Sequence, residues 1–258
     1  NRYPDKELLT QAVPDHPVFM GSLHGFAGWG NQMALDVAGI SAATEVPIGG
    51  EMRLGDDGKP NGLFLNRGVQ LLRSAIPDPS EETLTNQLLI GLNQMAQDGY
   101  VAVHDAGLNT RAMRILEKLE AEDRLPIRVY AMLSLRDEDL IRKWLEKGPD
   151  TDTDSMLVTR TVKAYYDGAL GSRGARLLYD YADQPGHRGI SGEGYGFNQE
   201  LTAAAMKAGF QIAIHAIGDA GNREALDILE RVFRGDPSTA SNRHRIEHAQ
   251  VLHPDDLP

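Results

Sequence analysis

The 258-residue chain is acidic, since 37 Asp and Glu residues outnumber 26 Lys and Arg residues and give a formal net charge of -11. This charge argues against a broad nucleic-acid surface, because proteins that bind phosphate backbones concentrate Lys and Arg, and the 41% hydrophobic and 24% charged content is that of a globular protein rather than a disordered or membrane-spanning one. The chain has no cysteine, which excludes disulfides and thiolate metal ligands but is compatible with either redox compartment. The acidic composition favours the cytoplasm.

Residues 1–62 show only short, interrupted secondary-structure patterns. Asn31 predicts the N-cap of a helix over residues 32–38, because an Asn side chain can accept a hydrogen bond from an N–H group of the first turn. Asp57 and Gly58 predict the turn of a hairpin.

From residue 63 onward, helical and strand patterns alternate. The predicted helices are residues 63–75, 80–98, 110–122, 137–147, 198–208 and 220–234. The predicted strands are residues 100–105, 127–133, 162–168, 211–217 and 245–250. Alternation of this kind implies right-handed βαβ units and a parallel sheet. We therefore expect an α/β fold with an incomplete TIM-type (β/α)8 barrel, and not a nucleotide-binding sheet, because no Gly-rich phosphate motif follows the first of these strands.

One connection is unusually rich in glycine. Residues 184–196 contain five glycines and few apolar anchors, and they follow the strand that carries Lys163. Because glycine loses much conformational entropy on ordering, we predict a mobile loop over the mouth of a site.

Lys163 lies within an otherwise apolar strand, where a charged amine would cost several kcal/mol unless it is neutralised, paired or coordinated. Three interpretations follow: a Schiff-base nucleophile, an ion-pair partner or part of a metal site. Strand alternation places Lys163, Tyr165 and Asp167 on one face. At about 3.3 Å per residue, Asp167 lies roughly 13 Å beyond Lys163 and therefore belongs to a rim loop.

His215 and His248 each lie on a predicted apolar strand. Either could be a core histidine bonded to a backbone carbonyl. Together with Lys163, however, they lie near the ends of three strands of one predicted barrel, which indicates a metal site, and imidazole suits Zn. His104, beside Asp105, is a candidate to support such ligands. The histidines that we assign to loops or the surface are His16, His187, His244 and His253.

Short motifs along nearly the whole chain carry a resemblance to a known family. They are LHG at 23–25, GNQMAL at 30–35, PIGGE at 47–51, DGKPNG at 57–62, VHDAG at 103–107, VK at 162–163, DGALGSR at 167–173, HAIGD at 215–219 and RIEHAQ at 245–250. Their order and spacing resemble the amidohydrolase superfamily, in particular the amidohydrolase-3 branch, which includes N-substituted formamide deformylases. After residue 63 that family commonly has an acid where this chain has Asn66 and Arg67.

The resemblance implies a ligand set. Lys163 would be the lysine of barrel strand four, often carboxylated to bridge two metals, and His215 and His248 would be the ligands of strands five and six. The family's first-strand His-x-His pair and last-strand Asp have no counterpart in this sequence. We therefore expect an internal fragment, in which residues 1–78 form an inserted segment packing on the barrel and residues 79–258 hold strands two to six.

The resemblance also implies a reaction, which is metal-dependent hydrolysis of an amide-type C–N bond in a small molecule. The cofactor would be one or two divalent metal ions, with Zn preferred. Lys163 and Asp219 are the candidate catalytic residues. His24, Ser172 and Arg173 are candidate substrate-binding residues on rim loops, with ordinary loop packing, or an ion pair for Arg173, as the alternative.

Two other classes remain open at the level of sequence. One is a catalytically inert binding or regulatory relative, and the other is a Schiff-base lyase that uses Lys163. The isolated fragment is expected to be inactive, because the family's remaining ligands are missing from it. It is also expected to form homo-oligomers, because an unclosed sheet exposes the backbone groups of its edge strands. Neither a nucleic acid nor a membrane is an expected partner.

Overall fold

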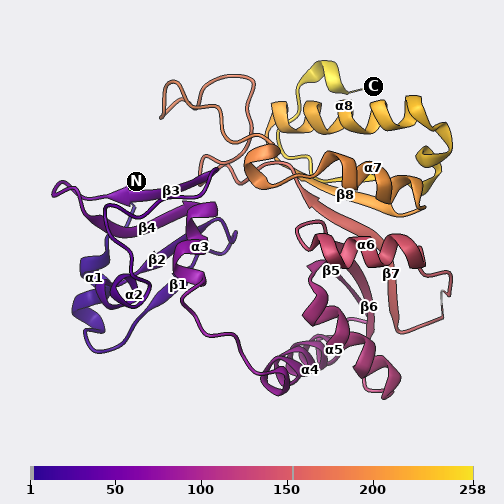
Figure 1. Ribbon diagram of the computed structural model, residues 1–258, viewed down its shortest axis with the longest axis horizontal. Helices are drawn as coiled ribbons and strands as arrows, with labels where there is room; N and C mark the ends of the chain where they lie inside the picture. Colours follow the sequence, from indigo (N-terminus) through magenta and orange to yellow (C-terminus); the bar gives the residue numbers. More distant parts are fainter. Residues whose placement is uncertain (1–2, 153, 258) are drawn as a thin grey trace. The chain divides into compact units, whose positions relative to one another are not determined.

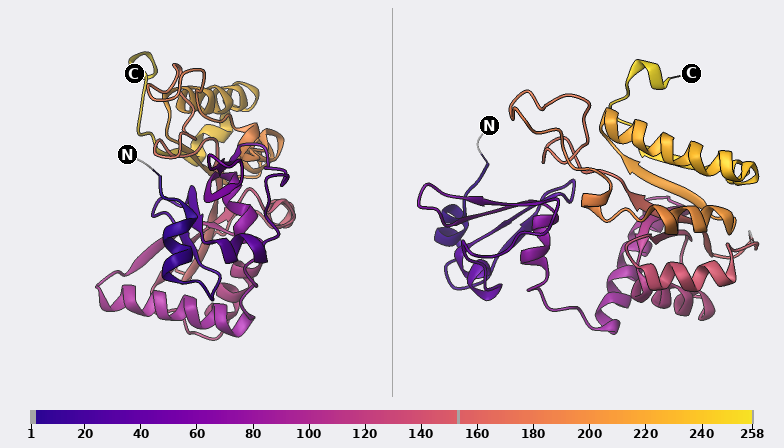
Figure 2. Two further views of the ribbon diagram at one scale, coloured as in Figure 1. Left: turned by 90° about the vertical axis from the view of Figure 1, so that its left-hand side faces the viewer. Right: turned by 45° about the horizontal axis from the view of Figure 1, so that its top comes forward.

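A computed structural model describes residues 3–152 and 154–257, which form two compact units (Figure 1; Figure 2). The first unit comprises Asn1–Asp78, Asp167–Tyr195 and Ile217–Gly221. The second comprises Pro79–Tyr166, Gly196–Ala216 and Asn222–Pro258. The first unit thus combines the N-terminal residues with two later segments. The predicted division into an insertion segment and a partial barrel stays a prediction.

The first unit contains a four-stranded antiparallel sheet in the order β1-β2-β4-β3. Its strands are β1 (Phe19–Gly21), β2 (Ala27–Gly30), β3 (Gly50–Leu54) and β4 (Pro60–Asn66). Its helices are α1 (Lys6–Ala12), α2 (Gln32–Val37) and α3 (Gln70–Arg73), with 3-10 turns η1 (Arg67–Val69) and η2 (Glu193–Tyr195). The core joins α2 and α3 to β4 through Leu35, Phe64 and Leu72.

Two local predictions in this unit are confirmed and one is wrong. The Asn31 side chain caps α2 by accepting a hydrogen bond of 2.9 Å from the Ala34 N–H, and β3 and β4 form a hairpin around Gly58. The helix predicted for residues 63–75 is wrong over residues 63–66, which belong to β4, whereas η1 and α3 do lie in its later part. Leu63, Phe64 and Leu65 are all buried, and a continuous apolar run of this length does not distinguish a buried strand from a helix.

Asp167 organises the later part of the first unit. Its carboxylate is fully buried and accepts hydrogen bonds of 2.9 Å from the backbone N–H groups of Arg176, Ile217 and Gly218. A Cβ atom on Gly218 would come within 1.9 Å of the Arg176 carbonyl oxygen, so a side chain has no room there. Asp167 therefore anchors loops, in agreement with its expected place beyond the Lys163 strand.

The Gly-rich connection is tied to the same unit. The Leu177 N–H donates to the Arg188 carbonyl at 2.8 Å, and the Ile190 N–H donates to the Gly174 carbonyl at 3.3 Å. The Tyr195 side chain at its end is buried. These contacts hold the loop at several points, and its mobility stays a prediction.

The second unit is built on a curled, five-stranded parallel sheet in the order β5-β6-β7-β8-β9 (Figure 1). Its strands are β5 (Ala102–Leu108), β6 (Arg128–Ser134), β7 (Leu157–Tyr165), β8 (Gln211–Ala216) and β9 (Arg245–His248). Its helices are α4 (Glu81–Gln97), α5 (Thr110–Ala121), α6 (Glu138–Lys147), α7 (Gln199–Lys207) and α8 (Asp219–Gly235), and α8 starts within the first unit. Two short 3-10 turns, η3 (Pro237–Asn242) and η4 (Pro254–Asp256), flank β9. This sheet confirms the predicted mixed α/β class and has the form of a half-barrel.

The helices cover one face of this sheet. Alternate strand residues such as Val129, Leu133 and Ile214 belong to the same buried cluster as Leu116 of α5 and Ile141 of α6. The intervening strand residues therefore lie on the other face, where polar side chains gather. None of the helices in residues 3–152 and 154–257 is long and apolar enough to cross a membrane.

Candidate metal centre

The strand register brings Lys163 and His215 to one sheet face. In the β7–β8 pair Lys163 lies opposite Ala213, and Tyr165 lies opposite His215. Their neighbours Ala164 and Ile214 belong to the helix-side core, so Lys163, Tyr165 and His215 occupy the other face. This is the carboxyl-terminal edge of the parallel sheet, where α/β enzymes place their chemistry.

His248 reaches the same place by a different route. Its register partner is Ala216 on the helix side, so regular alternation would turn the imidazole away from His215. Its backbone instead has φ of +78°, and Ala249 follows at +43°. Positive φ is uncommon for residues other than glycine and clusters at functional sites. With this backbone, the two imidazole rings lie edge to face with their centroids 4.5 Å apart.

Lys163 is buried at 3% exposure, and its ammonium group has few polar neighbours. The Nζ atom donates to the Ala164 carbonyl at 3.0 Å and lies 3.8 Å from the centroid of the Tyr165 ring. Burial lowers the pKa of Lys163 to about 7; the Glu247 charge opposes this shift, whereas Arg136 and Arg245 add to it. A large fraction of this amine is therefore neutral near pH 7, which leaves a nitrogen lone pair for a metal or an electrophile.

The pKa of His248 is lowered as well. Burial is the main cause and the Lys163 charge is the second, whereas the Glu247 carboxylate acts in the opposite direction. A neutral imidazole is the form that binds a metal.

Three side chains near this edge, those of Glu247, Arg245 and Arg136, were given no role from the sequence. Glu247 lies opposite His215 in the β8–β9 register, on the Lys163 face, and pairs with Arg245 at 2.6 Å. Arg136 follows the end of β6, and its guanidinium carbon lies 4.3 Å from the centroid of the Tyr165 ring. The sequence signal for Arg136 was its place just after a predicted strand, where parallel sheets carry functional residues.

The donor atoms fit part of a metal site. Two adjacent imidazoles and a lysine amine with a lowered pKa supply nitrogen ligands of the kind that Zn accepts. Within the described ranges, no group of three or more His, Asp or Glu side chains is arranged to hold a metal ion. Lys163 is therefore needed to complete a set of three protein ligands. His104, the predicted supporting residue, stacks on the Tyr130 ring at 4.5 Å, and its role stays a prediction.

The candidate substrate-binding residues belong to the first unit and have structural partners there. Ser172 is buried, and its hydroxyl donates a hydrogen bond of 2.8 Å to the Asn66 side-chain oxygen. The same oxygen accepts a second hydrogen bond of 2.8 Å from the Tyr195 hydroxyl. Arg173 forms an ion pair with Asp183, which is the alternative that the sequence left open. Asn66 therefore holds loops together at the position where the family commonly has an acid.

His24 and Asp219 also make local contacts. The His24 Nδ1 atom accepts a hydrogen bond of 3.1 Å from the Phe26 N–H, and the ring is exposed. Asp219 begins α8, and its Oδ1 atom accepts hydrogen bonds of 2.9 Å from the N–H groups of Leu178 and Ala220. The substrate-binding and catalytic roles of these residues stay predictions.

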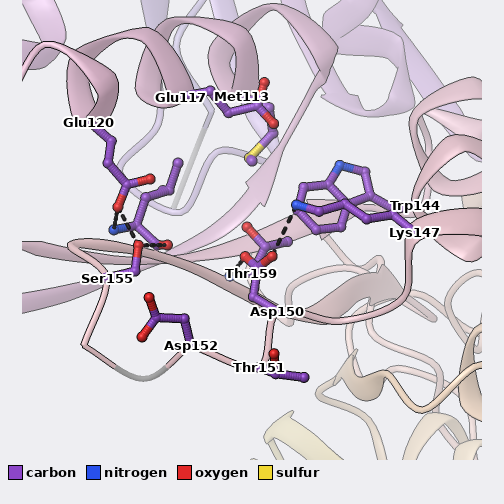
Figure 3. A pocket seen from close by; sticks show the side chains of 11 residues that line it. Met113, Glu117, Glu120, Trp144, Lys147, Asp150, Thr151, Asp152, Ser155 and Thr159 are labelled. Carbon is purple, nitrogen blue, oxygen red and sulfur yellow. Dashed lines mark hydrogen bonds and ion pairs between the residues drawn. The ribbon is translucent and has the colours of Figure 1, made fainter.

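A separate hollow of about 220 Å³ lies where β7 begins (Figure 3). Two of its carboxylates accept hydrogen bonds from backbone N–H groups: Glu120 from Leu157 at 2.7 Å, and Asp150 from Thr159 at 2.9 Å. Lys147 pairs with Asp150 at 3.0 Å and lies 3.8 Å from the centroid of the Trp144 ring. These contacts fasten the loop that enters β7, at the opposite end of the strand from Lys163.

The family assignment follows from comparison with known proteins. The model of the amidohydrolase family matches residues 1–258, and the chain belongs to this family. It is 29% identical over 259 residues to the putative amidohydrolase YtcJ of Bacillus subtilis and 27% identical over 263 residues to the N-substituted formamide deformylase of Arthrobacter pascens. In both cases the match covers 97% of this chain, but 46% and 47% of the relative.

A solved structure has the same fold. An uncharacterized metal-dependent hydrolase from Pyrococcus furiosus superimposes with a TM-score of 0.68 at 26% identity, covering 98% of this chain and 50% of that one. The chain thus spans about half the length of the relatives that it matches.

Proposed function

We propose that the protein, at its natural length, is a metal-dependent hydrolase that acts on an amide-type C–N bond of a small molecule. Lys163, His215 and His248 contribute its metal ligands, and Zn is the proposed metal. In this proposal β5 to β9 correspond to barrel strands two to six. The observation that carries it is the buried Lys163 amine, with a pKa of about 7, beside two imidazoles whose centroids are 4.5 Å apart.

The ligand residues have distinct tasks. A divalent metal bound there would supply a water of lowered pKa and polarise the substrate carbonyl. His215, on a buried strand, fixes the direction of one imidazole, and the positive φ of His248 sets the second beside it. Lys163 would supply either its neutral amine or, if that amine added to carbon dioxide and released a proton, the carboxylate oxygens of the resulting carbamate as metal ligands.

Further residues belong to the proposal on the strength of the family assignment. We retain Asp219 as a candidate catalytic residue and assign His24, Ser172 and Arg173 to substrate contact. His24 is supported by its exposed ring: among the described residues its hydrogen bonds involve only the Nδ1 atom, which leaves Nε2 for a ligand. Ser172 and Arg173 would make these contacts from a loop that Asn66 and Asp183 hold in place.

Metal removal tests this function. The protein at its natural length is treated with a chelator, dialysed, and assayed on formamides and other small amides before and after addition of Zn. We expect activity to be lost with the metal and restored by about one or two equivalents of Zn. Absence of metal-dependent amide hydrolysis, combined with borohydride trapping of a carbonyl compound on Lys163, would instead support the lyase.

A further inference from the structure

Asn66 ends β4 and bonds through its backbone to the turn that carries His24. Its N–H group donates to the Phe26 carbonyl at 2.7 Å, and the Phe26 N–H group donates to the His24 Nδ1 atom at 3.1 Å. Asn66 itself has φ of +52° and ψ of -127°. Residues other than glycine rarely adopt such a backbone conformation, which persists only where the surroundings hold it and which clusters at functional sites.

The side chain of Asn66 bonds to two later segments. Its oxygen accepts the hydroxyl groups of Ser172 and Tyr195 at 2.8 Å each, and its NH2 group donates to the Ser172 carbonyl at 3.1 Å. Because Ser172 and Tyr195 are only 2% and 3% exposed, water cannot readily replace these bonds. An amide combines in one uncharged group the acceptor and the donor that this position needs.

The loop of residues 168–174 fits closely around this side chain. A Cβ atom on Gly168 would overlap the Tyr195 hydroxyl, and one on Gly174 would overlap the Asn66 side-chain oxygen. The Tyr195 ring also packs edge to face on the Phe26 ring, with the centroids 6.1 Å apart. The two ends of the loop are therefore held against the pair formed by Asn66 and Tyr195.

The His24 ring adjoins the same loop. A Cβ atom on Gly171 would be in van der Waals contact with the His24 Nε2 atom, at 3.9 Å. The nitrogen that His24 offers to a ligand thus lies beside the loop that carries Ser172 and Arg173. Since Asn66 bonds to both segments, it sets the position of one relative to the other.

We propose that Asn66 is a positioning residue, which holds the His24 turn and the loop of residues 168–174 together so that His24, Ser172 and Arg173 contact one substrate. Asn66 itself contacts no substrate in this proposal. The inference rests on the proposed function for those substrate contacts, whereas the hydrogen bonds that hold the loop belong to the first unit alone.

Asn66→Gly tests the side chain alone, because glycine keeps the backbone N–H group and accepts a positive φ without strain. In the protein at its natural length we expect KM for N-ethylformamide to rise about 10-fold, as for the loss of one or two buried hydrogen bonds. The value of kcat and the bound Zn should stay within about twofold of the wild type, because a loosened contact of this kind weakens substrate and transition-state binding alike. Hydrogen exchange, followed by mass spectrometry without substrate, should become faster in residues 168–174.

Tyr195→Phe is the second variant, since it removes one hydroxyl group and keeps the ring that packs on Phe26. Its effects on KM and on exchange should have the same direction and be smaller. Combining it with Asn66→Gly should add nothing, because both substitutions act through one group. The matched control is Asn61→Gly in the same strand, because the Asn61 oxygen accepts from the nearby Leu63 N–H group at 3.0 Å. It should leave KM and the exchange of residues 168–174 unchanged.

An unchanged KM in Asn66→Gly, unchanged exchange of the loop, or an equal effect of Asn61→Gly would overturn the proposal. A parallel fall of kcat, bound Zn and unfolding temperature would also overturn it, since Asn66 would then serve only the stability of the fold. Hydrolysis by the wild type alongside any of these results would leave the proposed function standing. Faster exchange of the loop in a protein that hydrolyses no amide would instead refute the proposed function and support the hold of Asn66 on the loop.

Discussion

Replacing Lys163 with methionine is expected to lower kcat/KM of the protein at its natural length by about 10³-fold or more, because removal of a ligand disrupts the site that activates water. Methionine keeps an unbranched stem of similar length, with sulfur in place of one methylene, and lacks the amine. Since Lys163 is 3% exposed and a buried charge is costly, the variant should unfold at the same temperature or higher. Amide hydrolysis, bound Zn per chain and thermal unfolding would all be measured.

Lys147→Met is the matched control. Lys147 also lies 3.8 Å from the centroid of an aromatic ring, that of Trp144, but it is exposed and pairs with Asp150. It should leave activity and metal content unchanged. A Lys163→Met variant that kept its metal and activity but lost stability would show that Lys163 is a structural ion-pair partner of Glu247.

The 258-residue chain in isolation is expected to show no measurable amide hydrolysis. It spans about half the length of its relatives and offers Lys163, His215 and His248, whereas the family resemblance implies two further His ligands and an Asp. Absence of the proton-accepting Asp alone would remove a contribution of about 10²–10⁴ in rate. Turnover would be measured with the chain saturated with Zn.

The same chain should also self-associate. β5 and β9 are the two edges of the parallel sheet, and Val101, just before β5, is 81% exposed. Unpaired backbone groups at such edges bind other strands. Sedimentation would report oligomers that grow with concentration. Zn-dependent turnover by the isolated chain, lost in Lys163→Met, would contradict the assignment of the ligands or the expectation that further ligands are needed.

The parallel sheet was predictable because its signals are local. β6 and β8 contain short apolar runs bounded by polar or Gly-rich residues, and helices separate the strands of the second unit. β4 was not predictable in this way. Its apolar residues are buried between β2 and β3, so partners distant in sequence decide its conformation.

The site was predictable only in its most polar members. Lys163 and His215 were identified because each interrupts an apolar strand. The orientation of His248 depends on a φ of +78°, which no sequence pattern indicated. The position of Glu247 depends on strand register. Alternation along β9 puts Glu247 and His248 on opposite faces, but only the pairing of β9 with β8 places Glu247 opposite His215.

The roles of the rim-loop residues were also not predictable from the sequence. Ser172 and Arg173 were identified by their motif, but each has a partner that is distant in sequence. Ser172 bonds to Asn66, and Arg173 bonds to Tyr3 as well as to the nearer Asp183. Such contacts form only when the unit folds, so a loop motif alone cannot separate substrate binding from loop packing.

The most direct test of the account is the position of the metal. Crystals of the protein at its natural length, grown with Zn, would be measured on both sides of the zinc absorption edge. We predict an anomalous peak about 2.0–2.1 Å from a ring nitrogen of each of His215 and His248, and in contact with Lys163 or its carboxylated form. A fully occupied zinc peak bound elsewhere, with His215 and His248 bonded only to protein groups, would contradict the account.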